Sequence, residues 1–224
     1  MQPLTQQTVI MIMDDRAVIV VDGSTALARH LEQLGVKVYA VGSKLSEVQG
    51  TVLAEGEAIC WDMKAVVSPN MRSLMRRLLL SVPRDCIRIL DFNLKDINEE
   101  RLHLITLSLK CCDLLKIDVR EFSGVCSLLG LVGTHVFDDG FELMKRFRID
   151  TLVLTRGTRG CHVFHGNAVS EKWGYLPFAD CTQEEAEGAF TAAYFAVSQE
   201  SAKLFTDYHK QALDYLKHVC KPKR

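Results

Sequence analysis

Short apolar runs alternate along the chain with segments in which apolar residues recur at helical spacing. The apolar runs predict strands over Val9–Met13, Ala17–Val21, Val36–Val41, Ile87–Phe92, Leu114–Ile117, Thr151–Thr155 and Cys161–Phe164. The helical spacing predicts helices over Thr25–Leu34, Asn70–Leu80, Glu99–Lys110, Arg120–Leu129, Asp139–Arg148, Glu184–Ser198 and Ala202–Val219.

This alternation of strand and helix predicts an α/β fold with a mainly parallel central sheet that helices cover on both faces. Cys161–Phe164 is expected to run antiparallel to Thr151–Thr155, because only a short glycine-containing segment joins them. The sequence shows no internal repeat and no linker-like stretch, so residues 1–224 are expected to form one domain.

Composition narrows the classes of partner. The chain has 224 residues, 48% of them hydrophobic and 25% charged, with a formal net charge of −1. This balance gives no general attraction to nucleic acid, and no apolar run approaches the ~20 residues of a membrane span. The eight cysteines form no C-x-x-C pair, which argues against a zinc site or a disulfide framework. We therefore expect free thiols, a cytoplasmic protein, and neither nucleic-acid nor membrane binding.

Polar residues and glycines follow three of the predicted strands. In a doubly wound sheet, ligands bind beyond the carboxyl ends of the strands, where these residues would lie. Each group also has a simpler interpretation. Asp118 could cap the next helix with Glu121 as its capping-box partner, Asp91 and Asn93 could be turn residues, and the glycines after Thr155 could form a hairpin.

The order of these segments resembles the ribokinase/PfkB carbohydrate kinases, in which D-x-N-x-R, K-x-N-x-x-E and T-x-G-x-x-G follow one another. The matching positions, motif by motif, are Asp91, Asn93 and Lys95; Lys116, Asp118 and Glu121; and Thr155, Gly157 and Gly160. Lys replaces Arg in the first motif, Asp replaces Asn in the second, and the third is complete. The resemblance extends from about Asn70 to the C-terminus.

The resemblance implies a three-layer ribokinase-like fold and an ATP-dependent sugar kinase. It assigns the third motif to nucleotide binding, the second to the Mg²⁺ and phosphate region, and the first to the substrate side. ATP and Mg²⁺ are the implied cofactors, and a nucleotide or a small sugar is the implied partner. The oligomeric state stays open.

The last family motif, D-T-x-G-A-G-D-x-F, is where this sequence departs most. In one alignment Gly188 takes the place of the catalytic Asp, and in the other Ala186 does. Glu184, Glu185 and Glu187 bring negative charge to the segment that would bind phosphate. We therefore expect a catalytically impaired, pseudokinase-like protein with Glu187 as the candidate substitute base. The alternatives are a weakly active carbohydrate kinase and a non-enzymatic binding or remnant protein.

The N-terminal part, up to about residue 69, is abbreviated relative to the family. Its sugar-contacting positions would be Val21, Asp22 and Ala26, and residues 45–50 retain only the final glycine of a G-D-D-x-x-G loop. The segment from Gly50 to Asn70 is too short for the family's β-lid. We expect the lid to be reduced or absent, which would leave water in the transfer site.

Overall fold

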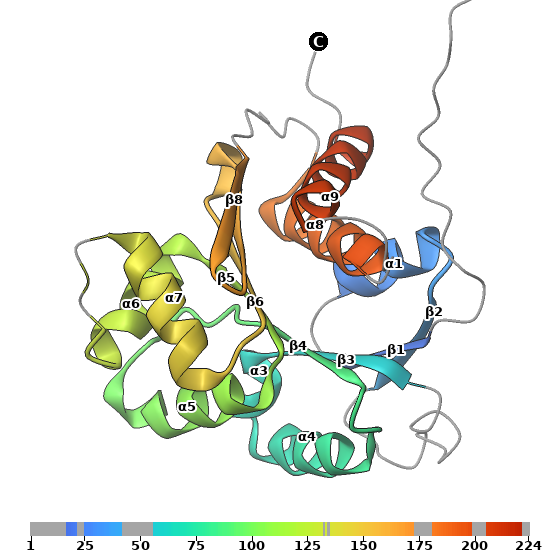
Figure 1. Cartoon of the computed structure of the whole chain (residues 1–224). Helices are drawn as coiled ribbons and strands as arrows, with labels where there is room; N and C mark the ends of the chain where they lie inside the picture. The colour runs from blue at the N-terminus through green and yellow to red at the C-terminus, as the bar shows by residue number, and fades with distance from the viewer. Residues whose placement is uncertain are drawn as a thin grey trace, which may run out of the picture.

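A computed structural model describes residues 17–21, 25–41, 56–131, 133, 135–172, 181–198 and 205–220. Its strands form one eight-stranded sheet in the order β2-β1-β3-β4-β5-β6-β7-β8 (Figure 1). The first six strands in sequence are parallel, β7 is antiparallel to β6, and β8 is antiparallel to β7. The predicted α/β fold with a mainly parallel sheet is confirmed.

Six of the predicted strands are present to within one residue at each end. The strands are β1 (Ala17–Val21), β2 (Lys37–Val41), β3 (Gly56–Asp62), β4 (Ile87–Asp91), β5 (Leu114–Asp118), β6 (Thr151–Thr155), β7 (Cys161–His165) and β8 (Ala168–Lys172). The sequence analysis did not predict β3 and β8, and the strand predicted over Val9–Met13 lies outside the described residues.

The helices also follow the predicted pattern. They are α1 (Thr25–Gln33), α3 (Met63–Val67), α4 (Pro69–Ser81), α5 (Leu102–Cys111), α6 (Val119–Leu128), α7 (Val136–Phe147), α8 (Gln183–Ser198) and α9 (Phe205–Val219), with 3₁₀ turns η2 (Glu99–Arg101) and η3 (Gly157–Arg159). The sequence analysis missed the short α3 and started the α7 helix three residues late, at Asp139.

The helices form two layers, one on each face of the sheet (Figure 1). Helices α3, α4, α5, α6 and α7 cover one face, and α1, α8 and α9 cover the other. Side chains of β1 alternate between the two cores: Ile19 and Val21 belong to the first, Val18 and Val20 to the second. A strand buried on both faces reads as a continuous apolar run, which is why β1 could be predicted.

All strands in the described part of the chain belong to this sheet, so that part contains no separate β-lid. β3 and α3 occupy most of the segment from Gly50 to Asn70, while Asp22 and the loop at residues 45–50 lie outside the described residues. No described helix is both long enough and apolar enough to span a membrane.

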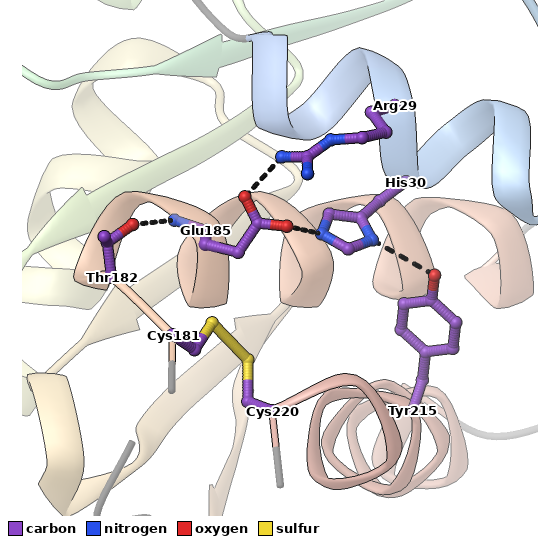
Figure 2. Close-up of a disulfide and its surroundings, with 7 residues drawn as sticks. All are labelled: Arg29, His30, Cys181, Thr182, Glu185, Tyr215 and Cys220. Carbon is purple, nitrogen blue, oxygen red and sulfur yellow. Dashed lines mark hydrogen bonds and ion pairs between the residues drawn. A yellow bond between two sulfur atoms is a disulfide. The ribbon is translucent and has the colours of Figure 1, made fainter. Parts of the chain in front are cut away.

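The cysteines differ from the expectation in one respect. Cys181, just before α8, and Cys220, just after α9, are joined by a disulfide with Cα atoms 5.6 Å apart (Figure 2). The expectation that all cysteines are free was therefore wrong for this pair, because spacing in the sequence does not reveal that two helix ends meet. The other six cysteines are free thiols, five of them buried.

Candidate functional site

A pocket of about 620 Å³ opens at the carboxyl ends of β3, β4 and β5 and at the start of α8. It is lined by Asp62, Lys64, Asp91, Asn93, Lys95, Ile97, Lys116, Asp118, Arg120, Glu121, Glu184 and Glu187. Its volume falls in the range of small-molecule sites. The pocket lies close to the point where the strand order reverses, between β1 and β3, which is where open α/β sheets bind ligands.

The strands themselves place these side chains together. β3, β4 and β5 all end in aspartate, at Asp62, Asp91 and Asp118. In the sheet register Asp62 is opposite Asp91, and Asp91 is opposite Lys116. Since neighbouring strands are about 4.8 Å apart, the parallel sheet gathers these charges at one edge. All residues of the first two predicted motifs, and Glu187, line the pocket.

Lys116 is the central cation of the pocket. Its side chain is 4% exposed, and its Nζ lies 2.9 Å from Asp91 Oδ1 and donates a further hydrogen bond to Glu187 Oε2. Burial alone would lower the pKa of Lys116. The charges and hydrogen bonds of Asp91 and Glu187 raise it by more than burial lowers it, so the net shift is upward. Lys116 is therefore a permanent ammonium held between two carboxylates.

Asp118 and Glu121 form the capping box that the simpler interpretation predicted. Asp118 caps α6, and its Oδ1 accepts hydrogen bonds from Arg120 N and Nε, both at 2.9 Å. Glu121 Oε2 accepts from the backbone N–H of Asp118 at 3.3 Å, and Oε1 from that of Leu94 at 2.8 Å. Burial raises the pKa of Glu121 despite these bonds. Both oxygens of Glu121 are therefore engaged with the backbone.

Asp62 is a site residue that the sequence analysis missed. It is 2% exposed, and its Oδ1 caps α3 by accepting from Ala65 N at 2.9 Å. Its Oδ2 is buried and has no hydrogen-bond partner among the described residues. Burial raises the pKa of Asp62 to about 6. The signal was present in the sequence as the apolar run Ala58–Trp61 followed directly by an acid.

The first turns of α8 present different residues to its two sides. Glu184 and Glu187 line the pocket. Glu185 points to α1, where it forms ion pairs with Arg29 and with His30, the latter at 2.7 Å (Figure 2). A Cβ at Gly188 would lie 2.8 Å from Ala26 Cβ and 2.9 Å from the backbone N of Leu27.

Neither of the two positions that align with the family's catalytic Asp faces the pocket. Gly188 packs against α1, and Ala186 is buried in the core beneath α1, α8 and α9. Val21 and Ala26, aligned with sugar-contacting positions, are also buried and do not line the pocket. Within this segment, the residues that line the pocket are therefore Glu184 and Glu187.

The third motif forms a hairpin turn beside the pocket. Thr155 ends β6 opposite Asp118, and its Oγ1 donates to Ile117 O at 3.5 Å. Gly157 and Gly160 have φ of +56° and +93°, values that favour glycine, and Arg156 N donates to Gly160 O at 2.9 Å. The hairpin interpretation is confirmed. These three motif residues are not among the pocket lining.

Two other predicted residues lie at the rim of the pocket. Asn93 has a φ of +32°, a conformation that Asn tolerates better than most residues, so it is the turn residue expected. Lys95 is exposed, as is Lys64 on the neighbouring element. These two lysines are the cations at the mouth of the pocket that form no ion pair with the described residues.

No family model matches the sequence, and no curated protein matches it either. Among solved structures, the chain is similar to an aminoimidazole riboside kinase from Salmonella enterica, with a TM-score of 0.62, 14% identity, and coverage of 96% of this chain and 83% of that one. An uncharacterized sugar kinase from Pyrococcus horikoshii gives a TM-score of 0.63, 15% identity, and coverage of 92% and 75%.

A fructokinase from Vibrio cholerae, in a form with fructose, ADP and potassium ion bound, gives a TM-score of 0.62 at 14% identity and covers 92% of this chain and 87% of that one. At these identities the likeness concerns the fold alone. The chain has the ribokinase-like α/β fold of these kinases.

Proposed function

We propose that this protein is a sugar-kinase-like protein that binds a nucleotide at this edge of the sheet and transfers phosphate poorly. The observation that carries the proposal is the ion pair between Glu187 and Lys116. A general base needs a lone pair within reach of the hydroxyl it deprotonates. Glu187 Oε2 accepts a hydrogen bond from the buried ammonium of Lys116, so this carboxylate is already engaged by the protein and is not held free for a sugar hydroxyl.

The phosphate side supports the same proposal. Oriented N–H groups at a helix N-terminus stabilise anions, but here the carboxylates of Glu184 and Glu187 face the pocket from the start of α8. Lys64 and Lys95 are the cations at its mouth that could contact phosphate. The fructokinase with bound ADP supports a nucleotide as the ligand of this fold.

Mg²⁺ usually binds one or two carboxylates together with phosphate oxygens and water. Among the described residues no cluster of three or more potential ligands is present, and Glu121 has both oxygens on backbone N–H groups. The residues therefore fit a metal held mainly by the nucleotide, with Asp118 as the protein carboxylate. Such an ion would neutralise phosphate charge at an acidic pocket.

Calorimetry with ATP and Mg²⁺ tests the nucleotide proposal. We expect binding that Gly157→Val weakens at least about tenfold, because a β-branched side chain would occupy the space through which a ligand approaches the turn. Gly130→Val is the matched control, since Gly130 also has a positive φ of +69° and open space around its Cβ position, but lies at the end of α6. Equal affinity in both variants would exclude the turn from the site.

A weakly active carbohydrate kinase is the second candidate, and the position of Glu187 in the pocket is the observation that favours it. ATP consumption over a panel of hexoses and pentoses separates the two. Turnover in the ordinary enzyme range of ~1–10³ s⁻¹ that Glu187→Gln abolishes and Glu184→Gln retains would establish this candidate. Negligible turnover together with ATP binding supports the impaired kinase.

The proposal extends to the whole chain. We propose that residues 1–224 form one ribokinase-like domain of a cytoplasmic protein. A remnant without any ligand is the outcome if neither ATP nor a sugar binds.

A further inference from the structure

One residue that lines the pocket, Asp62, has a buried carboxylate oxygen without a hydrogen-bond partner among the described residues. Asp62 is held in place by its cap on α3, because Oδ1 accepts the N–H of Ala65 at 2.9 Å. This bond leaves Oδ2, which is buried and has no hydrogen-bond partner among the described residues, in a side chain that lines the pocket. A buried acceptor without a hydrogen bond costs about 1–3 kcal/mol. A donor supplied by a ligand would recover that cost.

The charges around Asp62 favour a cationic donor. The pocket is lined by six carboxylates and four cationic side chains. Lys116 is engaged by Asp91 and Glu187, and Arg120 by Asp118 at 2.9 Å. The two remaining cations, Lys64 and Lys95, are exposed at the rim. Since carboxylates outnumber cations in the lining, the pocket carries an excess of negative charge.

We propose that the pocket binds a small ligand through a protonated amine that donates to Asp62 Oδ2. The ligand class is thus an amine-bearing polyol or another compact ammonium compound rather than a neutral sugar. A hydroxyl could satisfy the oxygen but would leave the buried charge uncompensated, whereas an ammonium does both. This inference rests on the proposed function, in which the pocket binds the substrate that would receive the phosphate. It concerns Asp62, which lies outside the turn proposed to bind the nucleotide.

The protonation of Asp62 gives the binding a definite pH dependence. Burial, with a smaller contribution from Asp91, raises the pKa of Asp62 to about 6, although Ala65 N–H and Lys64 oppose the shift. Asp62 is therefore ionised near neutral pH and becomes protonated as the pH falls through about 6. Lys116 stays protonated throughout this range, because its pKa is raised. Ammonium binding should weaken on acidification through this window.

The test uses two small probes of nearly equal size, 2-aminoethanol and ethylene glycol, on the full-length protein. The backbone amide of Ala65 is the reporter in an NMR titration, because it donates to Asp62 Oδ1. We expect saturable shifts with 2-aminoethanol near neutral pH, at least about tenfold weaker binding of ethylene glycol, and loss of this preference at about pH 5.

Asp62→Asn is the decisive variant, because Asn also caps helices well and removes the charge without changing the size. It should bind both probes with equal, weak affinity, whereas Glu100→Gln, at an exposed site outside the pocket lining, should behave as wild type. Equal binding of the two probes to wild type, no shift with either, or a preference that survives Asp62→Asn would overturn the proposal.

Nucleotide binding is measured separately on the same variants. Loss of ammonium binding in Asp62→Asn with ATP affinity unchanged supports this inference together with the proposed function. Ammonium binding without any ATP binding would leave this inference standing and remove the nucleotide proposal.

Discussion

Both sides of the first turns of helix α8 carry glutamates, but one side faces the pocket and the other packs against α1. On the pocket side, Glu187 binds the buried Lys116 and Glu184 faces the cavity. On the other side, Glu185 binds Arg29 and His30 (Figure 2), and Gly188 lies against the backbone of α1. An acidic helix start is favourable against the helix dipole in any case, so composition alone does not tell which carboxylate serves a site and which joins two helices.

The difference also shows how the site depends on the packing behind it. Gly188 allows α1 and α8 to approach closely, while Glu184 and Glu187 of the same helix line the pocket. The disulfide between Cys181 and Cys220 joins the ends of α8 and α9 on the same side. The side of α8 that packs against α1 and α9 therefore fixes the position of the helix, and the other side places two carboxylates in the pocket.

The largest expected effect comes from the pocket side. Lys116→Met would leave the carboxylates of Asp91 and Glu187 without their shared partner, and breaking a buried ion pair in this way costs ~3–5 kcal/mol. We expect a loss of unfolding free energy near the lower end, because Glu187 is 20% exposed. Urea denaturation measures it. Lys95→Met, at the exposed rim, is the control, and equal losses in both variants would contradict the central role of Lys116.

The disulfide should give the next largest effect, on the packed side. Its cysteines are separated by 39 positions, and closing a loop of that size stabilises a protein by ~2–4 kcal/mol. Cys181→Ser or Cys220→Ser should lower the free energy of unfolding by that amount. Cys111→Ser, at a free and partly exposed cysteine, should have a much smaller effect. A loss as large in Cys111→Ser would mean that the bridge contributes little.

The third effect tests the contact between α1 and α8. In Gly188→Ala the new Cβ would meet backbone atoms of Ala26 and Leu27 at 2.9–3.0 Å, and such overpacking costs ~1–3 kcal/mol. Gly124→Ala is the matched helical control, because its Cβ would meet the flexible end of Ile97 at 3.2 Å. Thermal unfolding compares the two. A Gly188→Ala protein as stable as Gly124→Ala would show that α1 can move away.

The smallest effect concerns the pH dependence of the packed side. Burial alone would raise the pKa of Glu185. Arg29 and His30 lower it by more than burial raises it, so the net shift is downward from the ordinary value of 4.5. A lowered folded-state pKa means that the contribution is complete above that value and is lost as the pH falls through the folded-state pKa. We expect the advantage of wild type over Glu185→Gln, ~0.5–1 kcal/mol near neutral pH, to disappear on acidification.

Glu184→Gln is the control for that titration, because Glu184 faces the pocket and has no ion pair to α1 among the described residues. Urea denaturation at several pH values measures both variants. An advantage of wild type that persists unchanged in acid would place the stabilisation outside the Glu185 ion pairs.

Much of the fold could be predicted because most strands are continuous apolar runs. β3 was missed because its sequence GEAICWD has a single β-branched residue and no alternation, and β8 because it is a short, mostly polar edge strand. The residues of the first two motifs could be placed at one sheet edge, since parallel strands share it. Asp62 could not, because its strand was not recognised.

Which side chains of α8 face the pocket could not be predicted from the sequence, for a different reason. Aligning Gly188 or Ala186 with a catalytic position assigns a place along the helix but not the direction of a side chain. That direction depends on the fit of Gly188 against Ala26, a contact between residues far apart in sequence. The meeting of Cys181 and Cys220 depends in the same way on how α8 and α9 pack.

The double role of Glu121 has a consequence for how the protein opens. One carboxylate accepts the N–H groups of Leu94, after β4, and of Asp118, at the start of α6. Neither amide can exchange its hydrogen with solvent until its bond to Glu121 breaks. The connection after β4 and the first turn of α6 should therefore become accessible to exchange in a single cooperative event, so that Leu94 and Asp118 share one opening free energy although 24 positions separate them in the chain.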